Sequence, residues 1–293
     1  MSRHASQVVV GIDGSDSAVR AAVWAAAEGA RHNVPLRLVH AYFQPYLYYP
    51  PFATATTEND LLLARAHRDL VAAAAAVRAA QPGVAVRTEL RRGHPVQTLL
   101  DESSTARMLV LGARGRYGFD ALLLGSTAVA VAAHASCPVA VIRGEVDDPS
   151  LPVVVGVDGS PVSEAAVAIA FDEASTRGAK LVAVHAWGEI PDESLYSLTE
   201  VPEQTARIED QERRVLAERL AGWQEKYPDV PVERVVVRQR SAVALVEQAA
   251  KALLVVVGSH GRGGFTGMLI GSTSQALLHH APCPVIVVRP ARS

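Results

Sequence analysis

Cysteine is scarce in this chain of 293 residues, which holds only Cys137 and Cys283. Two thiols cannot supply the disulfide framework of a small secreted scaffold, so that class is excluded and a reducing compartment is favoured. An excess of either charge is also missing, because 28 basic and 30 acidic residues leave a formal charge of −2. Without a basic field we expect no nucleic-acid partner and no anionic membrane partner.

The sequence argues against a transmembrane helix, because turn residues interrupt its long uncharged stretch. It argues against a signal peptide, because the apolar run near its N-terminus is short. The uncharged stretch 121–142 is long enough to cross a bilayer. Gly125-Ser126-Thr127 and Ser136-Cys137-Pro138 interrupt it, so we interpret it as a loop, a buried helix and a buried strand. The apolar run at 8–10 is too short for a signal peptide. We therefore expect a cytoplasmic protein.

What the sequence does contain is a repeat with a period of about 145 residues. At 49% hydrophobic and 20% charged residues the composition is that of a soluble globular protein, and the length suits two domains. The matching segments are VVVGIDGS at 8–15 and VVVGVDGS at 153–160, LVHAY at 38–42 and AVHAW at 183–187, and VLGARGR at 110–116 and VVGSHGR at 256–262. We predict one domain at 1–144, a polar linker at 145–151 and a second domain at 152–293.

Within each half, apolar β-branched runs alternate with helical patterns. In the first half the strands are expected at 7–13, 36–42, 84–90, 107–112 and 138–142, and the helices at 17–31, 58–81, 95–104 and 126–135. Continuous apolar strands joined by helices indicate a parallel sheet buried on both faces. The predicted fold class is α/β, with two repeated Rossmann-like domains, each an open five-stranded parallel sheet flanked by helices. Ser15 or Ser17 is expected to cap the first helix, and Ser160 its counterpart.

A glycine pattern follows the fourth strand of each half. Gly112-x-x-Gly115, nine residues and Gly125-Ser126 recur as Gly258-x-x-Gly261, nine residues and Gly271-Ser272. Glycines after such a strand let backbone N–H groups approach a phosphate, and the N-terminus of the next helix favours an anion. One such motif more often only makes turns, but two copies at equal spacing favour phosphate binding. Arg116 and Arg262 add a cation to each loop.

Acidic and imidazole side chains lie at the ends of the first two expected strands of each half. Asp13 and Asp158 could accept hydrogen bonds from a ribose or an adenine amine, or could make an Asx turn within Asp-Gly-Ser. These two readings have equal weight. For His40 and His185 a hydrogen bond to the backbone is favoured over a ligand contact. The histidines show no zinc spacing, and the two cysteines are interpreted as buried filler.

These motifs resemble the tandem-domain universal stress proteins of the ATP-binding type, familiar from actinobacteria including mycobacteria, over residues 6–144 and 152–290. The resemblance implies one ATP in each domain, which Mg²⁺ could accompany. It implies a homodimer, and pairing of the two halves within the chain through their last strands, 138–143 and 284–289.

The resemblance also implies the residues that contact the nucleotide. Asp13 and Asp158 would meet the adenosine part, Val39 and Val184 would offer backbone to the adenine edge, and the glycine loops would hold the phosphates. In the first half the set is Gly11, Asp13, Val39, Gly112, Ala113, Arg114, Gly115, Arg116, Gly125, Ser126 and Thr127. In the second half it is Gly156, Asp158, Val184, Gly258, Ser259, His260, Gly261, Arg262, Gly271, Ser272 and Thr273.

One aromatic segment has no counterpart in the second half. Six of the fifteen aromatic residues lie at 42–52, namely Tyr42, Phe43, Tyr46, Tyr48, Tyr49 and Phe52. Such a loop can be a flap that packs on its own domain. The alternative is a functional loop, which either forms a contact surface between chains or covers a nucleotide as a lid.

The predicted function is that of an ATP-loaded sensor or regulator in stress response or growth arrest. The sequence shows neither a P-loop nor a Gly-x-Gly-x-x-Gly after the first strand, and it suggests no catalytic residue and no metal site. The alternatives are an adenine-nucleotide enzyme, such as a slow ATPase or an adenylate or phosphoryl transferase, and an interaction module with degenerate pockets. The enzyme's usual motifs, His-x-Gly-His among them, are absent.

Overall fold

Two units of one architecture make up the chain, and they divide between Arg143 and Gly144. The computed structural model describes residues 7–43, 55–116, 124–144, 148–188, 202–261 and 270–289. We call the units the N-terminal half and the C-terminal half.

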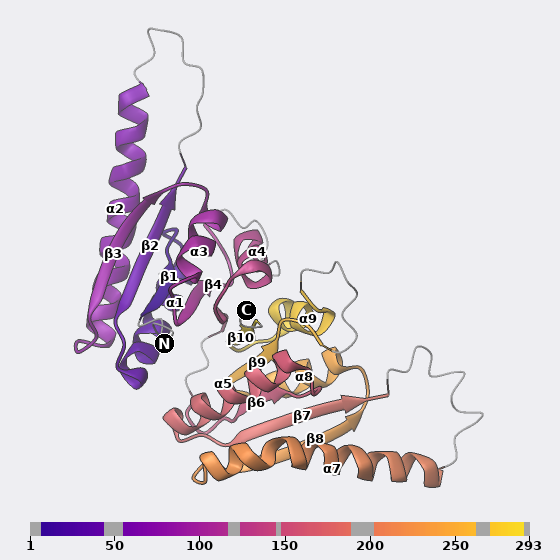
Figure 1. The fold of residues 1–293 in the computed structure, drawn as a ribbon. Helices are drawn as coiled ribbons and strands as arrows, with labels where there is room; N and C mark the ends of the chain where they lie inside the picture. Colours follow the sequence, from indigo (N-terminus) through magenta and orange to yellow (C-terminus); the bar gives the residue numbers. More distant parts are fainter. Residues whose placement is uncertain are drawn as a thin grey trace. The chain divides into compact units, whose positions relative to one another are not determined.

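The N-terminal half alternates strands and helices (Figure 1). Its elements are β1 (Val8–Gly11), α1 (Asp16–His32), β2 (Leu36–Tyr42), α2 (Ala55–Ala80), β3 (Val86–Arg92), α3 (Pro95–Ser103), β4 (Met108–Gly112), α4 (Ser126–His134) and β5 (Val139–Ile142). The C-terminal half repeats the pattern as β6 (Val153–Gly156), α5 (Pro161–Arg177), β7 (Leu181–Trp187), α7 (Pro202–Lys226), β8 (Val232–Arg238), α8 (Ser241–Ala249), β9 (Leu254–Gly258), α9 (Ser272–His280) and β10 (Val285–Val288).

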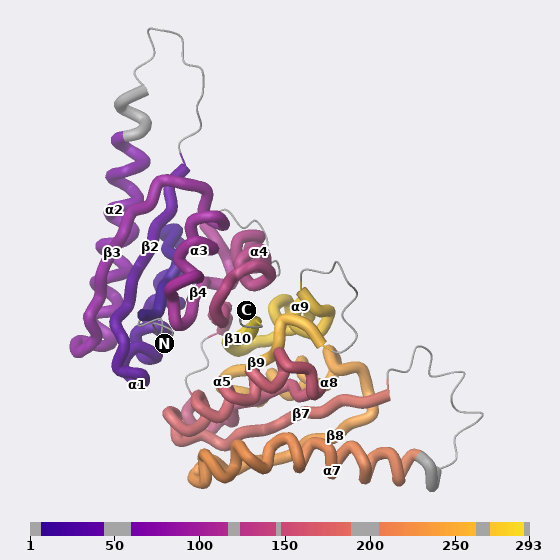
Figure 2. The backbone as a smooth tube through the Cα atoms, viewed as in Figure 1, coloured from indigo at the N-terminus to yellow at the C-terminus, as the bar shows by residue number. Residues whose placement is uncertain are grey.

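Each half holds a parallel sheet whose strand order reverses direction once. The order is β3-β2-β1-β4-β5 in the N-terminal half and β8-β7-β6-β9-β10 in the C-terminal half. After β3 the chain returns through α3 to place β4 beside β1 (Figure 2). The α/β fold class is therefore confirmed, and the switch point between β1 and β4 is where such sheets bind ligands.

The expected elements are present, with small differences at their ends. The first strand was expected to reach 13 but ends at Gly11, because the Asp13 carboxylate accepts the Ser15 N–H at 2.9 Å and turns the chain. Ser15 is the cap of α1, since its Oγ accepts the Ala18 N–H at 3.1 Å; Ser17 is already helical. Ser160 caps α5 in the same way.

The core is aliphatic and lies between the sheet and its helices. All residues of β5 and β10 are buried, and Val9, Val10, Leu109 and Val110 expose nothing. Both cysteines are buried as predicted, and burial raises the pKa of each thiol to about 12. Among the described residues, no helix is long and apolar enough to cross a bilayer.

Matched helices end with the same backbone geometry but different residues. Asn33 ends α1 at a φ of 51°, and Gly178 ends α5 at a φ of 62°. Both are left-handed caps whose N–H bonds back to helix carbonyls. The repeat thus preserves the conformation of these positions while the side chain changes.

Candidate functional site

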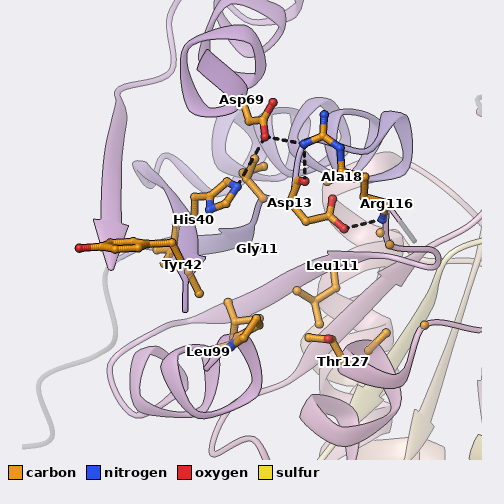
Figure 3. A pocket seen from close by; sticks show the side chains of 18 of the residues that line it. Gly11, Asp13, Ala18, His40, Tyr42, Asp69, Leu99, Leu111, Arg116 and Thr127 are labelled. Carbon is orange, nitrogen blue, oxygen red and sulfur yellow. Dashed lines mark hydrogen bonds and ion pairs between the residues drawn. The ribbon is translucent and has the colours of Figure 1, made fainter. Parts of the chain in front are cut away.

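A cavity of about 660 Å³ opens at the carboxyl ends of β1, β2 and β4, at the switch point of the N-terminal half (Figure 3). Every residue that the sequence predicted for this half lines it except Ala113, which is buried. We call it the N-terminal cavity. Its volume is in the range of small-molecule and cofactor sites.

Asp13 joins the two loops that border this cavity. Its Oδ1 accepts the N–H of Ser15 at 2.9 Å and the hydroxyl of Ser15 at 2.6 Å. Its Oδ2 accepts the backbone N–H of Arg116 at 3.0 Å. The predicted Asx turn is therefore present, and the same carboxylate also lines the cavity and fixes the end of the glycine loop.

The two arginines of the glycine loop have different partners. Arg116 is ion-paired with Asp69 of α2 (Nη1–Oδ2 2.9 Å), and the same nitrogen lies 3.4 Å from the carbonyl oxygen of Asp13. Arg114 is exposed, and within the described parts of the chain its guanidinium has no ion-pair partner. Arg114 is thus the cation of this loop that an anion could reach without breaking an ion pair.

The N-terminus of α4 faces the cavity without a side-chain cap. Gly125 is the N-cap residue, and Gly125, Ser126, Thr127 and Ala128 all line the cavity. The Gly125 N–H donates to the Ala113 carbonyl at 2.8 Å, which fixes α4 against the glycine loop. The first N–H groups of a helix have no partner within it, so this end offers donors and a positive dipole to an anion.

The glycines of the motif serve different purposes. A Cβ at Gly112 would lie 2.7 Å from the carbonyl carbon of Ser17 in α1. A Cβ at Gly125 would meet only ordinary contacts, the nearest being the Gly115 nitrogen at 3.5 Å. Gly112 therefore lets α1 approach β4, whereas Gly125 leaves room next to the α4 N-terminus.

The histidines of the second strands, His40 in β2 and His185 in β7, also differ between the halves. His185 lies 2.7 Å from the Val157 carbonyl oxygen through Nδ1, which confirms the predicted backbone contact, and 3.0 Å from Glu212 Oε2 through Nε2. His40 lines the N-terminal cavity, and its Nε2 is 3.6 Å from Asp69 Oδ2 (Figure 3). Burial lowers the pKa of His40, although the charge of Asp69 opposes this.

Replacing His40 with glutamine is expected to flatten the pH dependence of stability below about pH 6.5. Because the pKa of His40 is lowered in the folded protein, the unfolded chain binds more protons there, and stability falls as the pH falls. The measurement is the melting temperature between about pH 5 and pH 7. His67→Gln, at an exposed position of α2, should keep the wild-type slope. Equal slopes for His40→Gln and the wild type would contradict the assignment.

In the C-terminal half the predicted residues take equivalent places. Gly156 ends β6 and Asp158 follows that strand, Val184 lies in β7, and Gly258 ends β9. A Cβ at Gly261 would lie 2.5 Å from Asp158 Oδ2, so this carboxylate adjoins the glycine loop as Asp13 does.

The next helix of the C-terminal half also begins as in the N-terminal half. Gly271 is the N-cap of α9, which begins with Ser272 and Thr273. Ser259 is buried with its Oγ 3.1 Å from His260 Nδ1. Arg262 lies outside the described residues.

The contribution of α2 to the N-terminal cavity was not predicted from the sequence. Arg65, Ala66 and Asp69 of α2 line the N-terminal cavity, and Asp69 is the acid that meets both Arg116 and His40. The available signal was a carboxylate beside the buried face formed by Ala66 and Leu70. No motif marks Asp69, because its partners come from the glycine loop (Arg116) and from β2 (His40).

Of the aromatic segment, Tyr42 and Phe43 are described. Both line the N-terminal cavity, and the Phe43 ring lies 4.0 Å from the His94 ring by centroids. Phe43 is nevertheless 48% exposed. Tyr46, Tyr48, Tyr49 and Phe52 lie outside the described residues, so the flap, the lid and the contact surface all stay predictions.

Comparison with known proteins identifies the family of the chain and supports its fold. The model of the Universal stress protein family matches residues 5–143 and 151–289. The chain is 47% identical to the universal stress protein Rv2005c of Mycobacterium tuberculosis over 96% of each chain. It is 43% identical to a universal stress protein of Mycolicibacterium smegmatis over 97% of each. The crystal structure of a universal stress protein from Archaeoglobus fulgidus matches with a TM-score of 0.71 at 20% identity, covering 97% of this chain and 98% of that one, and shows the same fold.

Proposed function

The chain belongs to the universal stress protein family, and we propose that it binds ATP and acts as a nucleotide-loaded sensor or regulator in stress response. The observation that carries the proposal is the uncapped N-terminus of α4, which faces the N-terminal cavity beside a glycine loop. Backbone N–H groups at a helix N-terminus and in a glycine loop are donors that bind phosphate oxygens. The C-terminal half repeats the loop and the helix start, so the proposal extends to one ATP in each half.

The N-terminal cavity offers separate surfaces to the parts of a nucleotide. The loop 112–116 and the first turn of α4 suit the phosphates, with Arg114 as the accessible cation. Apolar side chains of β2, α2 and α3, among them Val39, Leu62 and Leu99, suit a base. Asp13 stands between these surfaces, where a ribose would lie.

The carboxylates of the cavity suit a metal ion poorly as ligands. Both oxygens of Asp13 already accept hydrogen bonds, and Asp69 is paired with Arg116. Mg²⁺ would therefore be held by the ATP phosphates, with the hydroxyls of Ser126 and Thr127 as the available protein oxygens. When bound, the ion would neutralise phosphate charge that Arg114 alone does not balance.

The test is to identify what the native protein carries and what it binds. We expect mass spectrometry of the purified chain to find an adenine nucleotide, and calorimetric titration to give saturable binding of ATP. Absence of any adenine nucleotide, together with no binding at millimolar ATP, would overturn the proposal. Turnover of ATP by the loaded protein would favour the enzyme instead. Light scattering of the same sample tests the proposed homodimer.

Ser126→Glu is expected to weaken ATP binding by the N-terminal half about tenfold, because the carboxylate would occupy the anion site and repel phosphate. Ser126 is exposed in the first turn of α4, where an acidic residue favours the helix, so the melting temperature should not fall. Ser126→Ala is the control, since it removes the hydroxyl and keeps the N–H donors. The affinity is measured by calorimetry. Equal affinities for Ser126→Glu and Ser126→Ala would contradict phosphate binding at this helix.

A further inference from the structure

The two halves differ on their long helices, α2 and α7, at positions that line the N-terminal cavity in the first half. Gln81, which follows α2, donates its N–H to the Val77 carbonyl, and Tyr227, which follows α7, donates to the Trp223 carbonyl. These matching bonds align the ends of the two helices. Fifteen residues earlier along each chain segment stand Ala66 and Glu212, which are therefore equivalent.

This exchange introduces a carboxylate where the N-terminal cavity has a methyl group. Ala66 is 2% exposed and lines that cavity. Glu212 is only partly exposed, and its carboxylate reaches His185 Nε2 at 3.0 Å. His185 is the counterpart of His40, which lines the N-terminal cavity. The Glu212 carboxylate therefore lies in the region of the C-terminal half that corresponds to cavity in the N-terminal half.

Other exchanges reduce the positive charge of the C-terminal half at the same place. The N-terminal cavity is lined by Arg65, Asp69 and Arg114. Their counterparts are Gln211, Val215 and His260. Two guanidinium groups and one carboxylate are thus replaced by uncharged or imidazole side chains. Together with Glu212, these exchanges make the C-terminal surroundings less favourable to a polyphosphate.

We propose that the two halves bind nucleotide unequally, and that Glu212 is the specificity-determining residue that weakens binding in the C-terminal half. The inference rests on the proposed function, because it ranks the two sites for the same ligand. A partly buried carboxylate repels phosphate more strongly than a fully solvated one. It also fills space that an alanine leaves open. The N-terminal half therefore fills with ATP first, by at least tenfold in affinity.

Removing the carboxylate tests this assignment. In calorimetric titration with ATP, the full-length wild type should show one tight site and one at least tenfold weaker. Glu212→Ala should strengthen the weaker site about tenfold, whereas Glu218→Ala, at an exposed position of the same helix, should change nothing. In the double variant Ser126→Glu, Glu212→Ala, the ratio of the two affinities should change by about a hundredfold toward the C-terminal site.

The reciprocal change adds a second readout. Ala66→Glu should weaken the tight site at least tenfold, with Ala64→Glu at an exposed position of α2 as its control. Circular dichroism shows whether the Ala66→Glu variant folds. If that variant does not fold, the Glu212→Ala titration alone tests whether Glu212 weakens ATP binding. Two equal sites in the wild type, or an unchanged weaker site in Glu212→Ala, would overturn the inference. Absence of ATP binding in every variant would instead overturn the proposed function.

Discussion

Replacing Gly112 with alanine is expected to lower the free energy of unfolding of the N-terminal half by about 3 kcal/mol. The new methyl would lie 2.7 Å from the carbonyl carbon of Ser17 and 2.8 Å from its oxygen. Both atoms belong to the backbone of α1, so no side-chain rotation relieves the contact. The first turn of α1 must move away from β4, and the Asp13–Ser15 turn moves with it. Urea unfolding followed by circular dichroism measures the loss.

Gly125→Ala is the matched control within the same motif. Its methyl would meet only contacts of 3.5 Å and longer, and the φ of −63° suits any residue. Stability should therefore stay within about 0.5 kcal/mol of the wild type. ATP affinity should fall, because the methyl lies beside the N–H donors of α4. If Gly112→Ala were as stable as the wild type, the close approach of α1 to β4 would not be the reason for this glycine.

Phe171→Ala is expected to lower the free energy of unfolding of the C-terminal half by about 3–5 kcal/mol. Phe171 of α5 exposes nothing, and its ring stacks on two rings from α7 and the residue after it. The centroid distances are 6.1 Å to Trp223 and 5.7 Å to Tyr227. Alanine would leave a cavity between α5 and α7, and the lost contacts would not be regained by small shifts.

Phe171→Leu serves as the comparison, because it keeps most of the buried volume and should lose about 1–1.5 kcal/mol. Urea unfolding followed by circular dichroism and tryptophan fluorescence reports the loss, with Trp223 next to the substituted ring. A loss under about 1 kcal/mol for Phe171→Ala would show that the helices close over the gap. Binding of ATP by the N-terminal half should be unaffected.

The strands could be predicted from the sequence because each of them is a local apolar run. Parallel strands buried on both faces are continuous apolar runs such as Val8–Val10, and those runs are visible without knowledge of their neighbours. The site residues next to strand ends were visible for the same reason, because Asp13 and the glycine loop are local motifs. Ala113 was included by its place in the motif, but its side chain turns into the core.

Contacts between distant segments could not be predicted in this way. Asp69 meets Arg116 and His40 only because α2 packs with a particular rotation above the ends of β1 and β2. The aromatic stack of Phe171 and Trp223 depends likewise on how α5 faces α7. The sequence drew attention to the aromatic residues at 42–52 instead, because they are neighbours along the chain.

The left-handed caps Asn33 and Gly178 show that one backbone conformation in this fold accepts two different residues. Each pair of matched positions is a substitution that one fold has tolerated, so the chain preserves an internal mutational history. Where both copies agree, as at Gly112 and Gly258, packing against the first helix restrains them. Where they disagree, as at Ala66 and Glu212, the fold accepts either residue, so this position is open to set the two halves apart.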